Sequence, residues 1–273
     1  MIIYGKHSVQ ALTKWLEPNN LLKKNKLLNN YIESDLIKAT RAIYILKHNK
    51  KSNKNFDNNL LRYFPSYLFK EVDRPKLNFI CGNNSHQGIA VEFGQGFRFP
   101  NEIKQEMKLS NWLEYTREFG DTKNPLIIIL DRLQDPHNIG AIIRTAEALG
   151  VNGIILPKNG SAPLNDTVHH ISTGASLLIP IKWESNLVRT LQILKENNYW
   201  IISADVRGKE ITENDISKGA WALIIGSESK GIKPILLKNS DFRLKLPLSG
   251  QTESLNASVS AAIFMYLLKS SKK

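Results

Sequence analysis

From residue 125 onward, short apolar runs alternate with stretches of helical period, and this pattern constrains the fold more than any other feature. The run at residues 126–130 reads LIIIL, and helix-period residues at 139–149 follow it before Gly150. A continuous apolar run is typical of a strand buried on both faces. Strands separated by helices predict an α/β fold with a mostly parallel sheet, in which ligands bind beyond the carboxyl ends of the strands.

The same two periods predict the other elements of this region. Strands are expected at residues 153–156, 177–181, 200–204, 222–225 and 242–246, and helices at residues 187–196 and 256–268. We therefore expect a catalytic or binding domain over residues 124–273.

A small α/β domain is predicted over residues 1–97, joined to the larger one by a linker at 98–123 that contains a helix near 102–117. Within the small domain, strands are expected at residues 2–4, 42–46, 77–80 and 89–93, with a helix at 7–16. The segment CGNNSHQG between the last two strands has the composition of a turn.

The net charge of +12 favours a polyanionic partner, because each phosphate that is neutralised releases counterions. Residues 1–120 hold 19 Lys and Arg against 11 Asp and Glu, so the surplus is larger in the first part of the chain. General solubility is the alternative explanation. Net charge by itself does not distinguish RNA, DNA or an anionic membrane.

Several protein classes are disfavoured by simple features. Cys81 is the single cysteine, so no intrachain disulfide can form, which fits a reducing compartment. No apolar run approaches the roughly 18 to 20 residues that span a bilayer, and the first residues do not resemble a secretory signal. We expect a cytoplasmic protein without a membrane segment.

Three polar loops follow predicted strands, where an α/β sheet would hold a ligand. In the first, Asn138 precedes a helix as an N-cap type of residue, and Arg144 lies among apolar and small residues, which suggests a nearby anion. The second runs from Gly226 through polar residues to Gly231, where glycines allow close approach of a ligand. A capped helix with a solvated arginine and a simple strand-to-helix turn are the respective alternatives.

The third loop reads LPLSGQTESLNASVSAA, over residues 246–262, and leads into a helix that begins with small residues. Something must pack closely against that helix start, although a capped helix on a tight core explains it equally well. None of the three loops is decisive alone.

Taken in order, the loops resemble the three signature motifs of the SpoU-type, or TrmH-like, RNA 2′-O-methyltransferases of the SPOUT superfamily. The matching segments read NIGAIIR (138–144), IIGSESKG (224–231) and LPL followed by SLNASVSAA (254–262). A weaker resemblance links residues 2–13, 42–47 and 85–93 to the RNA-recognition module that precedes the catalytic domain in many of these enzymes. The arrangement is most similar to the branch that modifies a guanosine of large-subunit ribosomal RNA.

The resemblance implies a parallel sheet with a C-terminal trefoil knot, which the strand pattern alone would not predict. It also implies a homodimer that uses S-adenosylmethionine to methylate the ribose 2′-hydroxyl of ribosomal RNA. Backbone groups at Gly226, Leu246 and Leu255 would hold the cofactor, helped by the loop after residues 200–204.

Carried over by motif, the active-site residues are Asn138, Arg144, Glu228, Ser254 and Asn256. Because a guanidinium stays protonated in proteins, we expect Arg144 to clamp the target phosphate and lower the pKa of the hydroxyl rather than act as a free base. Glu228 and Asn138 would position Arg144, while Ser254 and Asn256 would orient the ribose or the helix start.

Two other interpretations stay open. The chain could be a non-catalytic RNA-binding or assembly protein on the same fold, or it could methylate transfer RNA. A nucleotide-binding enzyme of another class is disfavoured because neither Gly-x-Gly-x-x-Gly nor a P-loop is present. No metal is expected, because the pair His169 and His170 has no Cys or carboxylate at ligand spacing and is interpreted as surface histidines.

Overall fold

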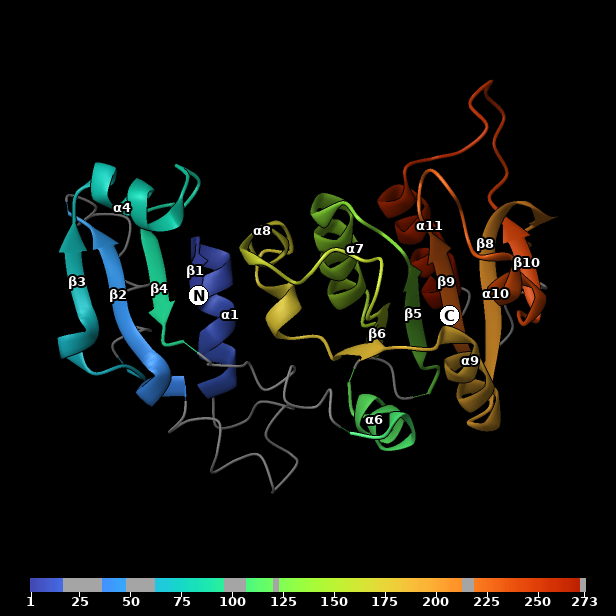
Figure 1. Ribbon diagram of the computed structural model, residues 1–273, viewed down its shortest axis with the longest axis horizontal. Coiled ribbons are helices and arrows are strands. Elements are labelled where there is room, and N and C mark those ends of the chain that lie inside the picture. Colours follow the sequence, from blue (N-terminus) through green and yellow to red (C-terminus); the bar gives the residue numbers. More distant parts are fainter. Residues whose placement is uncertain (17–35, 48–61, 96–106, 120–122, 213–218, 271–273) are drawn as a thin grey trace. The chain divides into compact units, whose positions relative to one another are not determined.

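The computed structural model describes residues 1–16, 36–47, 62–95, 107–119, 123–212 and 219–270 (Figure 1). Its contacts divide the chain into two compact units. One unit comprises Met1–Pro100 with His169–Leu177, and the other comprises Asn101–Val168 with Leu178–Lys273. The first unit therefore includes a segment from far along the chain, within the range assigned by sequence to the second domain. The domain boundaries inferred from the sequence stay a prediction.

The first unit is built on a four-stranded sheet in the order β1-β4-β2-β3. Its strands are β1 (Ile2–Tyr4), β2 (Thr40–Leu46), β3 (Phe69–Val72) and β4 (Ile89–Phe93). β4 is antiparallel to both β1 and β2, whereas β3 is parallel to β2. Helices α1 (Lys6–Leu16) and α4 (Arg74–Cys81) pack on these strands, and a short 3-10 turn, η2 (Ser66–Leu68), precedes β3.

The strand predicted at residues 77–80 is wrong, because this segment lies in helix α4. Asp73 caps the helix by accepting a hydrogen bond from Lys76 N at 3.0 Å, and Gly82 ends it in the left-handed region at φ 67°. Leu77 is fully buried and Phe79 is 88% exposed. Residues two apart share one face of a strand but lie on different sides of a helix, so the opposite burial of Leu77 and Phe79 fits a helix. The capping residues Asp73 and Gly82 favour a helix in this segment although its apolar residues suggested a strand.

The second unit contains a six-stranded sheet in the order β10-β8-β9-β5-β6-β7, and every neighbouring pair is parallel. The strands are β5 (Leu126–Asp131), β6 (Gly153–Pro157), β7 (Ile181–Glu184), β8 (Tyr199–Glu210), β9 (Ala220–Gly226) and β10 (Phe242–Lys245). The helices of this unit are α6 (Leu109–Thr116), α7 (Pro136–Ala148), α9 (Leu187–Glu196), α10 (Pro234–Lys238) and α11 (Ala257–Ser270). Helix α8 (Asp166–Ile171) begins in this unit, but its residues from His169 onward belong to the first unit. The predicted α/β class is confirmed.

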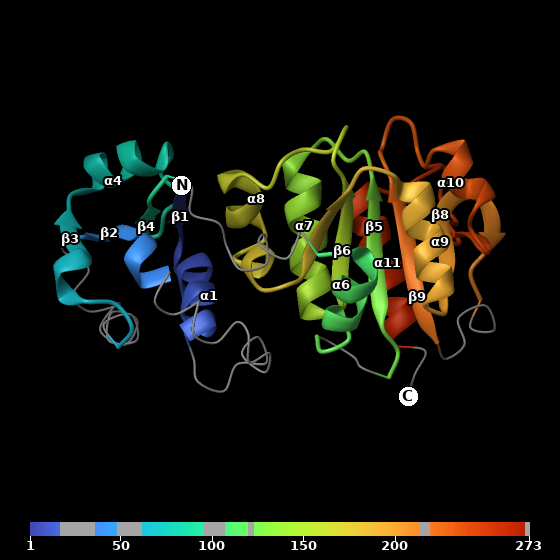
Figure 2. The ribbon, with the colours of Figure 1, turned by 60° about the horizontal axis from the view of Figure 1, so that its bottom comes forward.

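Helices cover both faces of the six-stranded sheet, as Figure 2 shows with α6 and α9 in front of it and α11 behind. Ile127 and Ile129 of β5 pack with Trp112 of α6 and Leu191 of α9 in one apolar cluster. On the opposite face, α11 packs against β9 and α7. All residues of β5 are buried, as its continuous apolar run predicted.

The strand predicted at residues 177–181 is misplaced. Ala175–Leu177 forms a 3-10 turn, η4, and β7 begins only at Ile181. The turn is fixed by Gly174 at φ 86°, where an added Cβ would lie 2.6 Å from the Cβ of Ala11 on α1. Because Gly174 contacts a residue far away in sequence, the position of this turn depends on tertiary packing and could not be predicted from the local sequence.

The prediction that His169 and His170 are surface histidines is wrong for His169, which is 3% exposed in the first unit. Its Nδ1 hydrogen-bonds Ser176 Oγ at 2.8 Å, and burial lowers its pKa to about 4. His170 is half-buried and stacks on Tyr4.

None of the helices that the structure describes has the length and apolar character of a membrane-spanning segment. The trefoil knot stays a prediction.

Candidate active site at the ends of the parallel strands

Helix α7 begins earlier than predicted, and this changes the environment of Asn138. Asp135, not Asn138, is the N-cap, and its side chain accepts a hydrogen bond from His137 N at 2.9 Å. Pro136 then occupies the first turn, where its missing N–H costs nothing. Asn138 therefore lies inside the first turn with 8% exposure, and its amide is available for contacts with other segments.

The Asn138 amide joins the first and second motifs. Its Nδ2 donates to Asp135 Oδ2 at 3.3 Å and to Oε1 of Glu228, which lies in the loop after β9. The Glu228 carboxylate therefore lies at the N-terminal turn of α7, where the helix dipole favours a negative charge. Two residues that are distant in sequence, and were both assigned to the site by motif, meet here.

The loop after β9 folds back on itself, and its glycines serve this turn. A Cβ added at Gly226 would collide with the backbone of Gly231 and Ile232. Gly231 adopts φ 60° and donates its N–H to Ser227 O at 2.8 Å, while Ser227 Oγ accepts from Lys230 N at 3.3 Å. The close approach at Gly226 is therefore made by the chain's own backbone.

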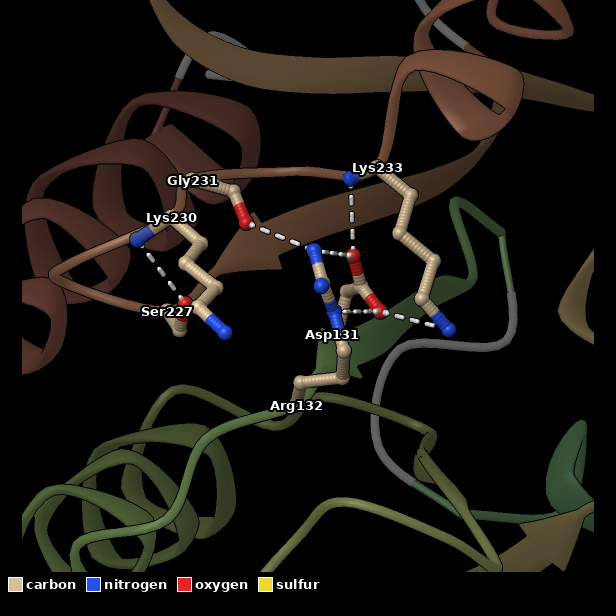
Figure 3. Close-up of polar contacts among 6 residues, drawn as sticks. All are labelled: Asp131, Arg132, Ser227, Lys230, Gly231 and Lys233. Atoms are coloured by element: carbon tan, nitrogen blue, oxygen red, sulfur yellow. Dashed lines mark hydrogen bonds and ion pairs between the residues drawn. The ribbon is translucent and has the colours of Figure 1, made fainter.

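Asp131, which was not among the site residues predicted from the sequence, anchors this loop to the central strand (Figure 3). It ends β5, is fully buried, and its Oδ2 accepts from Lys233 N at 2.8 Å. Arg132 Nε lies 3.2 Å from Oδ1 and Lys233 Nζ lies 3.9 Å from it. A charged residue directly after a buried apolar run was the available signal.

Arg132 completes the anchor from an unusual backbone conformation. Its φ is 61°, in the left-handed region that non-glycine residues seldom adopt, and its guanidinium donates to Gly231 O at 3.5 Å. Figure 3 shows the side chains of Arg132 and Lys233 converging on the same carboxylate. The loop that holds Glu228 is thus tied to the end of β5 at two points, Gly231 and Lys233.

Asn256 in the third motif caps helix α11. Its Oδ1 accepts from Ser258 N at 2.8 Å, from Ser258 Oγ at 2.6 Å and from Val259 N at 3.4 Å. Orienting the helix start is one of the two roles expected for Asn256, and the role of orienting the ribose stays a prediction. Ser254 is exposed, and Leu255 is half-buried directly before the cap.

The segment between β10 and Asn256 presents backbone donors and acceptors that the described part of the chain does not use. Residues 246–255 form no hydrogen bond with any other described residue, so their backbone N–H and C=O groups are available to a ligand. Leu246 and Leu255 are both half-buried, which leaves apolar surface beside those groups. Ligand sites commonly combine an apolar lining with a few backbone groups, so these residues fit the cofactor.

Arg144 lies further along α7 and its side chain points to solvent. It is exposed, and it forms no hydrogen bond or ion pair with any residue that the structure describes. The expectation that Asn138 and Glu228 position Arg144 is therefore not met within this single chain, where they bond to each other. Because α7 packs against α11, Arg144 and the third motif lie on neighbouring helices (Figure 1).

The loop expected after residues 200–204 is a bulge inside β8. Pairing with β10 shifts from Arg243–Ser203 to Leu244–Lys209, so the intervening residues leave the ladder. Within the bulge, Asp205 Oδ1 accepts from Arg243 at 3.1 Å.

Among the described residues, no group of three or more His, Cys, Asp or Glu is placed to hold a metal ion.

Comparisons with known proteins agree with this architecture. The model of the family described as "SpoU rRNA Methylase family" matches residues 125–266. A Bacillus subtilis protein, YacO, whose name assigns it to the TrmH family of tRNA/rRNA methyltransferases, is 44% identical over 195 residues, covering 71% of this chain and 74% of its own. A Staphylococcus aureus protein with the same family name is 32% identical over 270 residues, covering 97% and 94%.

Solved structures show the same fold at low sequence identity. The SpoU methyltransferase AviRb from Streptomyces viridochromogenes, in complex with AdoMet, superposes with a TM-score of 0.69 at 17% identity, covering 99% of this chain and 89% of that one. S-adenosylmethionine is the methyl donor of the family. The family match, the parallel sheet and the three motif loops lead to one conclusion: the chain belongs to the SpoU family of RNA methyltransferases.

Proposed function

We propose that this enzyme methylates the 2′-hydroxyl of a ribose in ribosomal RNA, at a guanosine of the large subunit. The observation that carries the proposed methyl transfer is the hydrogen bond between Asn138 and Glu228, which unites two motif loops at the end of β5 and β9. Ribosomal RNA and the guanosine are proposed from the resemblance of the sequence motifs. A carboxylate held at this edge is suited to a hydroxyl substrate, because it can accept the hydroxyl's hydrogen bond and orient its lone pair.

The residues divide the chemical task. S-adenosylmethionine, when bound, supplies an electrophilic methyl group. The harder requirement is to lower the pKa of a weakly acidic hydroxyl and align it with that methyl. Arg144, exposed and without an ion partner among the described residues, is free to bind the phosphate beside the target ribose. Its permanent charge would then stabilise the developing alkoxide.

The cofactor is held, in this proposal, by the backbone at Gly226, Leu246 and Leu255. Their support is the set of unused backbone groups in residues 246–255 and the position of Gly226 at the carboxyl end of β9. Ser254, exposed next to the Asn256 cap, would contact the ribose. Such a division leaves side chains for the RNA and main chain for the cofactor.

We further propose that the enzyme is a cytoplasmic homodimer whose interface includes α11. Three apolar side chains of this helix are exposed: Val259 at 47%, Ile263 at 37% and Tyr266 at 61%. Their spacing places them on one face of the helix. A second copy of the chain could bring its own α11 and α7 close to this face, which would also give Arg144 new neighbours.

The direct test uses purified enzyme, labelled S-adenosylmethionine and two unmodified transcripts, large-subunit ribosomal RNA and total transfer RNA. We expect label in the ribosomal RNA, and mapping of 2′-O-methyl groups should locate it at a guanosine. Glu228→Gln, which preserves size, serves as the matched inactive control. Label in transfer RNA alone would replace the substrate, and no transfer to either RNA would favour a non-catalytic RNA-binding role.

A further inference from the structure

A pocket of about 420 Å³ lies in the first unit, remote in sequence from the three motif loops. It is lined by residues 84–88 together with Leu46, Arg74 and His170. Its volume is at the lower end of the range for small-molecule sites, which suits one nucleotide better than a larger ligand. The lining combines an apolar side chain, amide and hydroxyl groups, imidazole rings and one guanidinium.

The wall formed by His86 is rigid. His86 is 1% exposed, its Nδ1 accepts from Gly88 N at 2.9 Å, and its Nε2 donates to Asn78 Oδ1 at 2.8 Å. These two bonds fix both the ring orientation and the tautomer. Burial and the nearby charge of Arg74 lower the pKa of His86, so the ring stays neutral at pH 7.

The loop beside His86 adopts a conformation that carries a cost. Gln87 has φ 54° and Gly88 has φ 88°, so two consecutive residues lie in the left-handed region. Gln87 Oε1 accepts from Lys6 N at 2.9 Å, which leaves the amide nitrogen of Gln87 as a donor. Strain of this kind at a non-glycine residue is typical of functional sites.

His170 supplies a second ring from a distant part of the chain. It lies in the same compact unit, and its ring stacks on Tyr4 with centroids 4.7 Å apart and planes at 29°. An aromatic ring that is already supported on one side is a suitable platform for a base. RNA-binding proteins commonly stack unpaired bases on such rings and read base edges with amide and hydroxyl groups.

Arg74 provides the charge that a phosphate requires. It is exposed at the start of α4, and it forms no ion pair or hydrogen bond with the described residues. Asn84 and Ser85, also in the lining, are exposed and offer an amide and a hydroxyl. The lining therefore offers a guanidinium for a phosphate, and amide and hydroxyl groups for a base or sugar.

We infer that this pocket receives one unstacked nucleotide of the RNA substrate, with Arg74 on its phosphate and His170 against its base. The inference rests on the proposed function, because the RNA is that substrate. A nucleotide within RNA is favoured over a free nucleotide because Arg74 is exposed at the pocket, where a continuing strand could pass. The first unit would thereby select RNA containing a loop or bulge rather than a regular duplex.

The first test maps contacts directly. Full-length enzyme is irradiated with an unmodified large-subunit ribosomal RNA transcript, the RNA is digested, and nucleotide adducts are located by mass spectrometry. We expect an adduct on the peptide that contains residues 84–88 or on the one that contains His170. Adducts confined to other surfaces of the first unit, or their complete absence, would overturn the inference even if the RNA is methylated.

The second test uses two charge-removing variants of the same helix. Arg74→Ala should raise KM for the RNA about tenfold while kcat at saturating RNA stays near the wild-type value, because one charge-assisted contact is lost. Lys76→Ala, also exposed on α4 but outside the pocket lining, should change KM by less than about threefold. Equal effects of the two variants would mean that Arg74 contributes only a general electrostatic attraction to RNA, which would contradict a specific nucleotide site.

Failure of the proposed function is separable from failure of the pocket. If no methyl is transferred but the adduct appears at the pocket, the nucleotide site is supported and the proposed methyl transfer is contradicted. If methyl is transferred but no adduct forms at the pocket, only the pocket assignment is wrong. Titration with AMP, GMP, CMP and UMP, followed by NMR of the histidine rings, separates the sources: tighter binding of a mononucleotide than of the RNA would contradict an RNA ligand.

Discussion

Asn138 donates a hydrogen bond to the carboxylate of Glu228, so the first turn of α7 and the loop after β9 are joined at the end of the parallel sheet. Glu228→Ala should lower kcat for methyl transfer at least tenfold, because a hydrogen bond to a charged group is lost along with the carboxylate itself. Asn138→Asp should act in the same direction by placing two like charges together. Both are measured with labelled S-adenosylmethionine, with cofactor affinity as a control. Unchanged kcat in Glu228→Ala would exclude a role for this carboxylate.

Arg144 is expected to act through the shape of its guanidinium as well as its charge. Arg144→Lys retains the charge but loses the planar pair of donors, so turnover should fall about tenfold or more, and Arg144→Ala should fall further. Because the side chain is exposed, the melting temperature should not change. Near-normal turnover in the lysine variant would refute a bidentate phosphate clamp.

Asp131 should contribute to stability more than an exposed ion pair does. Asp131→Ala removes a fully buried carboxylate that binds Lys233 N and Arg132, and we expect a loss of about 2 kcal/mol in the free energy of unfolding. Asp205→Ala breaks the more exposed pair with Arg243 and should cost less than about 1 kcal/mol. Denaturant unfolding of the whole chain compares them, and equal losses would contradict the anchor.

The exposed apolar face of α11 should govern association. Ile263→Asp places a charge between Val259 and Tyr266, and the dimer should dissociate in sedimentation or light-scattering measurements. Ile235→Asp, at a residue of α10 that is 49% exposed, is the matched control and should leave the mass unchanged. A monomeric wild-type enzyme with full activity would remove the dimer proposal.

Acid should destabilise the first unit through His169. Burial lowers its pKa to about 4, below the ordinary value near 6.5, so the unfolded state binds the proton first. Its contribution is complete above pH 6.5 and is lost as the pH falls toward 4, by up to about 3 kcal/mol. His169→Asn, which keeps a polar group near Ser176, should make the melting temperature less dependent on pH between pH 6.5 and 4. The exposed control His7→Asn should not, and identical slopes in both variants would rule out His169 as the cause.

The sequence by itself determined the class of the larger fold and the identity of the motif residues. The unbroken apolar run before Asp131 predicted a strand buried on both faces, and every residue of β5 is buried. The order of NIGAIIR, IIGSESKG and SLNASVSAA indicated the family, because each motif follows a strand. Patterns of this kind depend on a few consecutive residues only, so they can be recognised in the sequence without knowledge of the fold.

Only the tertiary structure decided which of these residues meet. It assigned the N-cap to Asp135 and paired Asn138 with Glu228, and it revealed Asp131 as the anchor of the second loop. It also brought His170 into the same compact unit as β1 and α1. These relationships join segments far apart in sequence, and packing, burial and hydrogen-bond geometry select them in ways that residue periodicity does not encode.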